Sequence, residues 1–218
     1  MADQKNDILN RLKNGLSAAR SVYSKNPSLH TGQKPKIAVV GCSDSRVPTD
    51  VLFDAKPGEL FTFRNIGNSL EDENNPKKLG ADALKFITYA NHLGVETLVI
   101  LPHGKCGCIA NACACAEGHG HGHGLEADIL KDMGNKKKFA VDLVKKEGAS
   151  AYLSSRGLPA GDQLQAVEIA HGLLMADMAR EHLKKLSSSM TVAVVYFDVA
   201  TCDAYAVFGT DGKFQKIV

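Results

Sequence analysis

Short apolar runs separated by longer amphipathic segments form the most regular pattern in this chain. Residues 37–40, 60–63 and 97–101 are almost continuously apolar, which is typical of strands buried on both faces of a parallel sheet. Residues 79–93 carry apolar residues at helical spacing and are followed by Gly94, which suits a helix C-terminus. This alternation predicts an α/β fold with a doubly wound, mainly parallel sheet flanked by helices.

The N-terminal segment predicts a helix that lies outside this sheet. Apolar residues recur at steps of three and four between residues 7 and 23, so one face of the helix is apolar. Proline and glycine residues interrupt the chain soon afterwards, so residues 1–30 are expected to form a helical arm. Because the arm cannot bury its apolar face by itself, we expect it to pack on another subunit of a homodimer or homotetramer.

The second half of the chain predicts further helices, a loop and a closing hairpin. The expected elements are helices over 106–117, 125–146 and 163–186 and a strand over 192–197 that leads to a hairpin with 204–208. Residues 118–124 alternate histidine with glycine, and glycine at this density disfavours a helix, so they are predicted to form a loop. No repeat or linker is visible, so residues 1–218 are predicted to form a single domain.

Composition and charge exclude several classes of protein. The chain has 218 residues, of which 44% are hydrophobic and 23% charged, and its formal net charge is +2. Such values are ordinary for a globular protein, and no basic stripe is interleaved with aromatic residues, so nucleic acid is not an expected partner. Residues 136–138 form the one lysine run, which is interpreted as a solvated helix face.

Hydropathy and cysteine spacing indicate the compartment. No apolar stretch is long enough to span a membrane, and the N-terminus lacks an apolar signal region, so no membrane partner is expected. Six cysteines occur, several of them in closely spaced pairs that do not resemble a secreted disulfide framework. A cytoplasmic location is therefore expected.

Cysteine and histidine residues follow two of the predicted strands and form a candidate metal site. Cys42 ends the first strand, and His103 and Cys106 follow the third strand in a His-x-x-Cys spacing. Ligands of open α/β sheets bind beyond the carboxyl ends of the strands, so the fold can bring these side chains together. Thiolate and imidazole suit zinc, and three protein ligands leave a fourth position open for catalysis. The charged pair Asp44 and Arg46 beside Cys42 would be unnecessary in a closed structural site.

Several blocks of the sequence resemble those of the β-class carbonic anhydrases. These blocks are Cys42-Ser43-Asp44-Ser45-Arg46-Val47, Pro57-Gly58-Glu59, Arg64-Asn65-Ile66-Gly67-Asn68, Gly80-Ala81 through Tyr89, and His103-x-x-Cys106-Gly107. The resemblance runs from about residue 33 to 109 and is weaker over 192–198. It implies reversible hydration of carbon dioxide to bicarbonate, with Zn²⁺ held by Cys42, His103 and Cys106.

The resemblance also implies roles for other residues. Arg46 would hold the Asp44 carboxylate, which would accept a hydrogen bond from zinc-bound water. Zinc lowers the pKa of bound water from 15.7 towards about 7, so hydroxide is available at neutral pH. Gln33 would donate its side-chain amide to a bicarbonate oxygen. The small-molecule substrate, carbon dioxide, would occupy an apolar pocket lined by Phe61, Ile66 and Tyr89.

Two other functions stay open on the residues alone. A hydrolase of COS or CS₂ could use the same scaffold, because zinc hydroxide attacks their carbon similarly. A metal-binding or metal-storage protein would instead use the additional cysteines and the histidine-rich loop, namely Cys108, Cys113, Cys115, His119, His121 and His123. Small buried thiols and a solvated loop are the plainer interpretation of these residues. His171 lies on the apolar face of its predicted helix and is expected to be a core or interface histidine.

Overall fold

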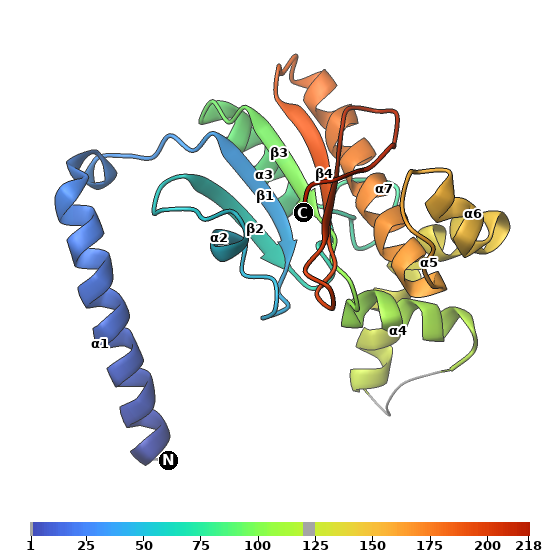
Figure 1. Cartoon of the computed structure of the whole chain (residues 1–218), viewed down its shortest axis with the longest axis horizontal. Helices are drawn as coiled ribbons and strands as arrows, with labels where there is room; N and C mark the ends of the chain where they lie inside the picture. The colour runs from blue at the N-terminus through green and yellow to red at the C-terminus, as the bar shows by residue number, and fades with distance from the viewer. Residues whose placement is uncertain (1, 120–124) are drawn as a thin grey trace.

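The computed structural model describes residues 2–119 and 125–218, and its centre is a six-stranded sheet (Figure 1). The strands are β1 (Ile37–Cys42), β2 (Leu60–Asn65), β3 (Thr97–Leu101), β4 (Thr191–Phe197), β5 (Ala204–Phe208) and β6 (Gln215–Lys216). Their order is β2-β1-β3-β4-β5-β6. The four strands β1 to β4 run parallel, and β5 and β6 are antiparallel to their neighbours. The predicted α/β class, the mainly parallel sheet and the closing hairpin are confirmed.

β1 lies between β2 and β3 and is buried on both faces. Ala38 and Val40 belong to the main core, to which α3 and α7 contribute, and both are fully buried. Val39 points to the other face and joins a smaller cluster that Leu52 helps to cover. Apolar side chains in consecutive positions are therefore all removed from water, as the continuous run in the sequence predicts.

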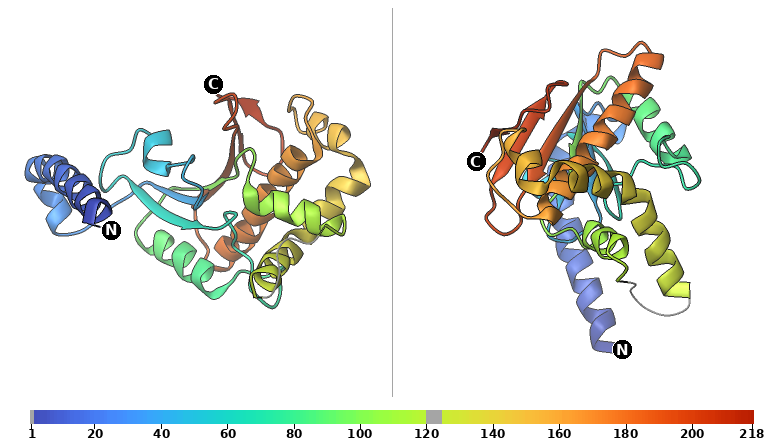
Figure 2. Two further views of the ribbon diagram at one scale, coloured as in Figure 1. Left: turned by 90° about the horizontal axis from the view of Figure 1, so that it is seen from below. Right: turned by 90° about the vertical axis from the view of Figure 1, so that its right-hand side faces the viewer.

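Helices flank the sheet, and the long ones lie close to their predicted positions (Figure 2). They are α1 (Ala2–Lys25), α2 (Thr49–Leu52), α3 (Ala81–His92), α4 (Gly107–Ala116), α5 (Leu125–Glu147), α6 (Ala149–Ser154) and α7 (Gln163–Lys185), with a 3₁₀ helix η1 (Pro27–His30). α7 packs on β3 and β4, and α4 packs on α5. The three short helices were not predicted, because four to six residues are too few to show a helical repeat. None of the described helices is apolar over a length that could cross a membrane.

α1 extends away from the sheet, and its main neighbour in the chain is η1 (Figures 1 and 2). Its apolar side chains are consequently exposed, as shown by Ile8 (57%), Leu9 (43%), Leu12 (54%), Leu16 (67%) and Tyr23 (41%). The predicted helical arm is thus present, and the single chain leaves its apolar face uncovered.

The prediction that residues 136–138 form a solvated face is wrong for Lys137. Lys138 is exposed and pairs with Asp142 on its own helix. Lys137 is 2% exposed, and its Nζ lies 3.0 Å from both carboxylate oxygens of Glu71. The local charge pattern cannot distinguish such a lysine from a solvated lysine, because its carboxylate partner comes from a loop far away in the sequence.

The predicted histidine–glycine loop falls mostly outside the described residues. Gly118 has a φ of +81° and ends α4, as a glycine at this position often does. His119 follows it, whereas His121 and His123 lie outside the described residues.

Candidate metal centre

The carboxyl ends of β1 and β3 bring three potential metal ligands together. Cys42 is the last residue of β1, His103 follows β3 and forms a bridge with Phe197, and Cys106 immediately precedes α4. All three side chains are buried, and their ligand atoms lie within 4.8 Å of one another. Within residues 2–119 and 125–218 no other group of three such side chains meets in this way.

His103 presents a bare ring nitrogen at this position. Its Nδ1 lies 3.0 Å from the Gly104 carbonyl oxygen, and since a carbonyl only accepts, Nδ1 carries the proton. Nε2 is buried and has no hydrogen-bond partner in the described part of the chain. A bare imidazole nitrogen beside two thiols is a donor set that Zn²⁺ prefers, so these residues fit the metal.

A hydrogen bond between the Cys42 and Cys106 thiols shifts their pKa values in opposite directions. Hydrogen bonding to Cys106 lowers the pKa of Cys42 to about 3, although burial opposes this shift. The same hydrogen bond, together with burial, raises the pKa of Cys106. The N–H of Gly67 also donates to Cys42 Sγ at 3.3 Å.

α7 supports the Cys106 turn from behind. The Cys106 N–H donates to Glu168 Oε1 at 2.8 Å, and the Tyr196 hydroxyl donates to Glu168 Oε2 at 3.3 Å. Glu168 is 1% exposed, and burial raises its pKa to about 7. Sequence reasoning missed Glu168, although it and His171 are the polar residues of the otherwise apolar stretch 166–176, which was the available signal.

Asp44 and Arg46 form a close ion pair beside the ligands. Arg46 Nε donates to Asp44 Oδ1 at 2.9 Å, and Arg46 Nη2 donates to Oδ2 at 2.6 Å. These hydrogen bonds hold the pKa of Asp44 well below its usual range. Arg46 Nη2 also donates to the Lys105 carbonyl at 3.0 Å, which ties the loop after β1 to the loop that carries His103.

Arg64 of β2 holds the backbone of the Cys42 loop and was also missed as a site residue. Its Nε donates to the Cys42 carbonyl at 2.8 Å, and its Nη2 donates to the Asp44 carbonyl at 2.8 Å. β2 and β1 are paired in parallel, so a long side chain near the end of β2 reaches the end of β1.

The four residues predicted to contact substrate are half-buried or exposed in the single chain. Phe61 stacks on Phe86 with ring centroids 4.9 Å apart, and the Tyr89 ring lies 5.8 Å from that of Phe61. Tyr89 is 50% exposed and Ile66 57% exposed, so the single chain does not enclose them. Gln33 is exposed in the segment between η1 and β1.

The additional cysteines form no second metal site among the described residues. Cys108 is buried, Cys113 and Cys115 are half-buried, and all six cysteines of the chain are free thiols. Cys115 packs close to Gly134 of α5, which indicates a packing role. His171 is buried and donates from Nε2 to the Gly67 carbonyl at 3.0 Å, as expected of a core histidine.

Comparison with known proteins agrees with this geometry. A family model described as carbonic anhydrase matches residues 37–203. β-Carbonic anhydrase 6, mitochondrial, of Arabidopsis thaliana is 37% identical over 83 residues, which cover 38% of this chain and 28% of that protein. A carbonic anhydrase of Helicobacter pylori is 37% identical over 81 residues, which cover 37% of this chain and 36% of that protein. The matched stretch therefore spans about a third of these curated relatives.

Solved structures share the fold at lower identity. The β-carbonic anhydrase CcaA superposes with a TM-score of 0.72 at 18% identity, over 97% of this chain and 93% of that one. A tetrameric β-carbonic anhydrase from Sordaria macrospora superposes with a TM-score of 0.64 at 22% identity, over 97% of both chains. The family match covers well over half of the chain and includes Cys42, His103 and Cys106. This chain belongs to the β-class carbonic anhydrase family.

Proposed function

We propose that the protein is a zinc-dependent carbonic anhydrase that reversibly hydrates carbon dioxide to bicarbonate and a proton. The observation that carries the proposal is the buried cluster of Cys42, His103 and Cys106. Within the described residues, His103 Nε2 in this cluster has no hydrogen-bond partner. Two thiolates and one imidazole would hold Zn²⁺ and leave one coordination position open. When bound, zinc supplies a Lewis acid that lowers the pKa of coordinated water from 15.7 towards about 7.

Asp44 and Arg46 are proposed to orient the attacking water. The carboxylate of Asp44 remains ionised because Arg46 donates to both of its oxygens, so it acts as a hydrogen-bond acceptor. Arg46 is itself restrained by Lys105, so the direction of the carboxylate is set by the loop that carries His103. An oriented acceptor reduces the reorganisation that the reaction would otherwise require.

The apolar side of the site is proposed to receive carbon dioxide. Phe61 and Tyr89 present neighbouring rings, and Ile66 adds an aliphatic side chain at the end of β2. Gln33 has an exposed amide that is available to donate to a bicarbonate oxygen. Ile66 and Tyr89 stay half-exposed in the single chain, so a second subunit would be needed to exclude water from this pocket.

We also propose that the protein is a homodimer or homotetramer. The exposed apolar face of α1 has no cover within the chain, and large apolar faces seldom stay in water. The Sordaria macrospora structures with the same fold are described as tetrameric. A reducing, cytoplasmic location is proposed because all six cysteines are free thiols.

Stopped-flow measurement of carbon dioxide hydration on protein of known zinc content tests this function. We expect about one zinc per chain and rapid hydration, with little sulfide released from COS or CS₂. Sulfide release that exceeds carbon dioxide hydration would instead support a hydrolase of these sulfur compounds. Two or more metals per chain without hydration would support a storage protein, although the described residues contain one three-residue group of this kind.

A further inference from the structure

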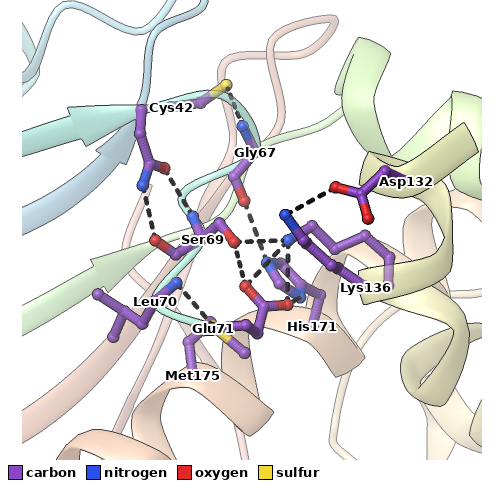
Figure 3. Close-up of polar contacts among 11 residues, drawn as sticks. Cys42, Gly67, Ser69, Leu70, Glu71, Asp132, Lys136, His171 and Met175 are labelled. Carbon is purple, nitrogen blue, oxygen red and sulfur yellow. Dashed lines mark hydrogen bonds and ion pairs between the residues drawn. The ribbon is translucent and has the colours of Figure 1, made fainter. Parts of the chain in front are cut away.

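A buried ion pair lies beside the candidate metal centre and has no part in the proposed reaction. Lys137 of α5 and Glu71 of the segment after β2 are each 2% exposed at their side chains. Lys137 Nζ lies 3.0 Å from both oxygens of Glu71 and 2.8 Å from Ser69 Oγ. Ser69 itself hydrogen-bonds Glu71 (Figure 3). Removing two charges from water is costly, so a pair at this position calls for an explanation.

His171 of α7 connects this pair to the loop after β2. Its Nε2 lies 3.0 Å from the Gly67 carbonyl oxygen and carries the proton, because a carbonyl only accepts. Burial, reinforced by Lys137, lowers the pKa of His171 to about 4, so the ring is neutral at neutral pH. Nδ1 is consequently bare, and it lies 3.6 Å from Glu71 Oε1.

Gly67 carries the connection to the metal centre. Its carbonyl accepts from His171, and its N–H donates to Cys42 Sγ, so both polar groups of the residue are engaged (Figure 3). Its φ is +75°, and a Cβ at this position would lie 2.7 Å from Cys108 Sγ. Glycine suits this position for both reasons, and the residue links His171 to the Cys42 sulfur through its two hydrogen bonds.

We propose that Lys137, Glu71 and His171 are positioning residues that keep the Gly67 N–H on the Cys42 sulfur. The inference rests on the proposed zinc site, in which Cys42 is a ligand. A hydrogen bond to a thiolate ligand changes the charge that the sulfur donates to the metal, and outer partners of this kind set metal affinity. None of the three residues is assigned contact with substrate, so their effect reaches the centre through Gly67.

Two substitutions of His171 test the connection without removing the ion pair. His171→Leu loses the donor to Gly67, whereas His171→Gln keeps an amide N–H that can replace it. In the full chain we expect His171→Leu to bind zinc about 10-fold or more weakly in competition with a chelator. The thiolate-to-metal absorption of the Co²⁺-loaded protein should shift as well. His171→Gln should restore both quantities to near wild-type values.

A second variant tests the ion pair itself. Lys137→Met combined with Glu71→Leu removes both charges together and should weaken zinc binding, as His171→Leu does. The control Lys138→Met, on the exposed side of α5, should leave zinc binding unchanged. If folded His171→Leu kept wild-type zinc affinity and an unchanged cobalt spectrum, the positioning role would be overturned and the proposed function would stand. Absence of zinc binding by the wild-type chain would overturn the proposed function together with it. If the double variant does not fold, the comparison of His171→Leu with His171→Gln decides whether the positioning role is correct.

Discussion

Arg46 donates to both carboxylate oxygens of Asp44 and also to the Lys105 carbonyl, so one side chain joins the two loops that carry the candidate ligands. A bidentate pair of this kind fixes the direction of the carboxylate as well as its charge. Arg46 is half-exposed, so the value of the pair for stability is small and its value for orientation is the larger one.

Arg46→Ala should retain zinc and lose carbon dioxide hydration by at least about 100-fold, the scale expected when a residue that orients the reacting groups is removed. The Asp44 carboxylate would then be free to rotate, and the attacking water would lose its acceptor. The loss should appear in kcat more than in KM, because carbon dioxide binds to apolar side chains. Stopped-flow rates at several pH values with zinc content checked at each would measure this.

Two variants bracket the interpretation of Arg46. Lys184→Ala removes an exposed ion pair on α7 and should leave the rate unchanged. Asp44→Asn should retain zinc with slower hydration. A nearly wild-type pH–rate profile in Arg46→Ala would show that the pair is structural only.

Cys106→Ser should lose tightly bound zinc and activity together. A hydroxyl is a much poorer ligand than a thiolate, and Cys106 belongs to the one group of three candidate ligands among the described residues. Elemental analysis after gel filtration gives the metal content per chain. Cys202→Ser, which changes an exposed thiol, serves as the control. Full zinc occupancy in Cys106→Ser would remove that residue from the ligand set.

Charged residues on the apolar face of α1 should dissociate the assembly. Leu12→Asp with Leu16→Asp places two carboxylates among side chains that we expect to be buried against another subunit. Sedimentation at micromolar concentration should change from a dimer or tetramer to a monomer. Asn14→Asp, on the opposite face of the helix, should keep the wild-type assembly. A wild-type protein that sediments only as a 23.3 kDa monomer would contradict the prediction.

Protonation of His171 should destabilise the metal-free protein in mild acid. The pKa of His171 is about 4 in the fold against 6.5 ordinarily, with Lys137 and Glu71 as the charged groups that face it. Between these pH values the unfolded chain takes up a proton that the folded chain refuses. This contribution to the free energy of unfolding is therefore complete above pH 6.5 and is lost as the pH falls towards 4.

Urea unfolding at pH 7 and pH 4.5 would measure the loss. At about 1.4 kcal/mol per pH unit, His171 should account for about 2–3 kcal/mol of it. His171→Gln should lose correspondingly less over the same interval, because glutamine does not titrate. Equal losses in the two proteins would mean that other groups dominate acid unfolding.

Gly67→Ala should weaken zinc binding because it disturbs the N–H that contacts Cys42. The new Cβ would lie 2.7 Å from Cys108 Sγ, and the φ of +75° adds strain of about 1–2 kcal/mol. Combination with Cys108→Gly should recover part of the affinity by making room, but not the part due to backbone strain. Gly15→Ala, where nothing lies within 4 Å, is the matched control. Chelator competition would quantify each change.

Local pattern was sufficient to predict five of the six strands and the meeting of the three candidate ligands, whereas the two-residue strand β6 was too short to be predicted. Residues 37–40 and 97–101 are apolar on both faces, so a buried parallel sheet is the arrangement that removes them from water. Cys42 ends β1 and His103 follows β3, and the carboxyl ends of these adjacent parallel strands lie side by side. Their role as zinc ligands, and the single domain over residues 1–218, remain predictions.

Only the tertiary structure decided which charged residues are buried. Lys137 was expected to be solvated and Glu71 and Glu168 were not selected, yet Lys137 meets Glu71 across 66 positions of sequence, and Cys106 meets Glu168 across 62. Hydropathy scores a side chain by its own solvation, whereas the burial of a charge depends on a partner that the fold supplies. The fold likewise leaves Ile66 and Tyr89 exposed in the single chain, although both are apolar, and the subunit proposed to cover them remains a prediction.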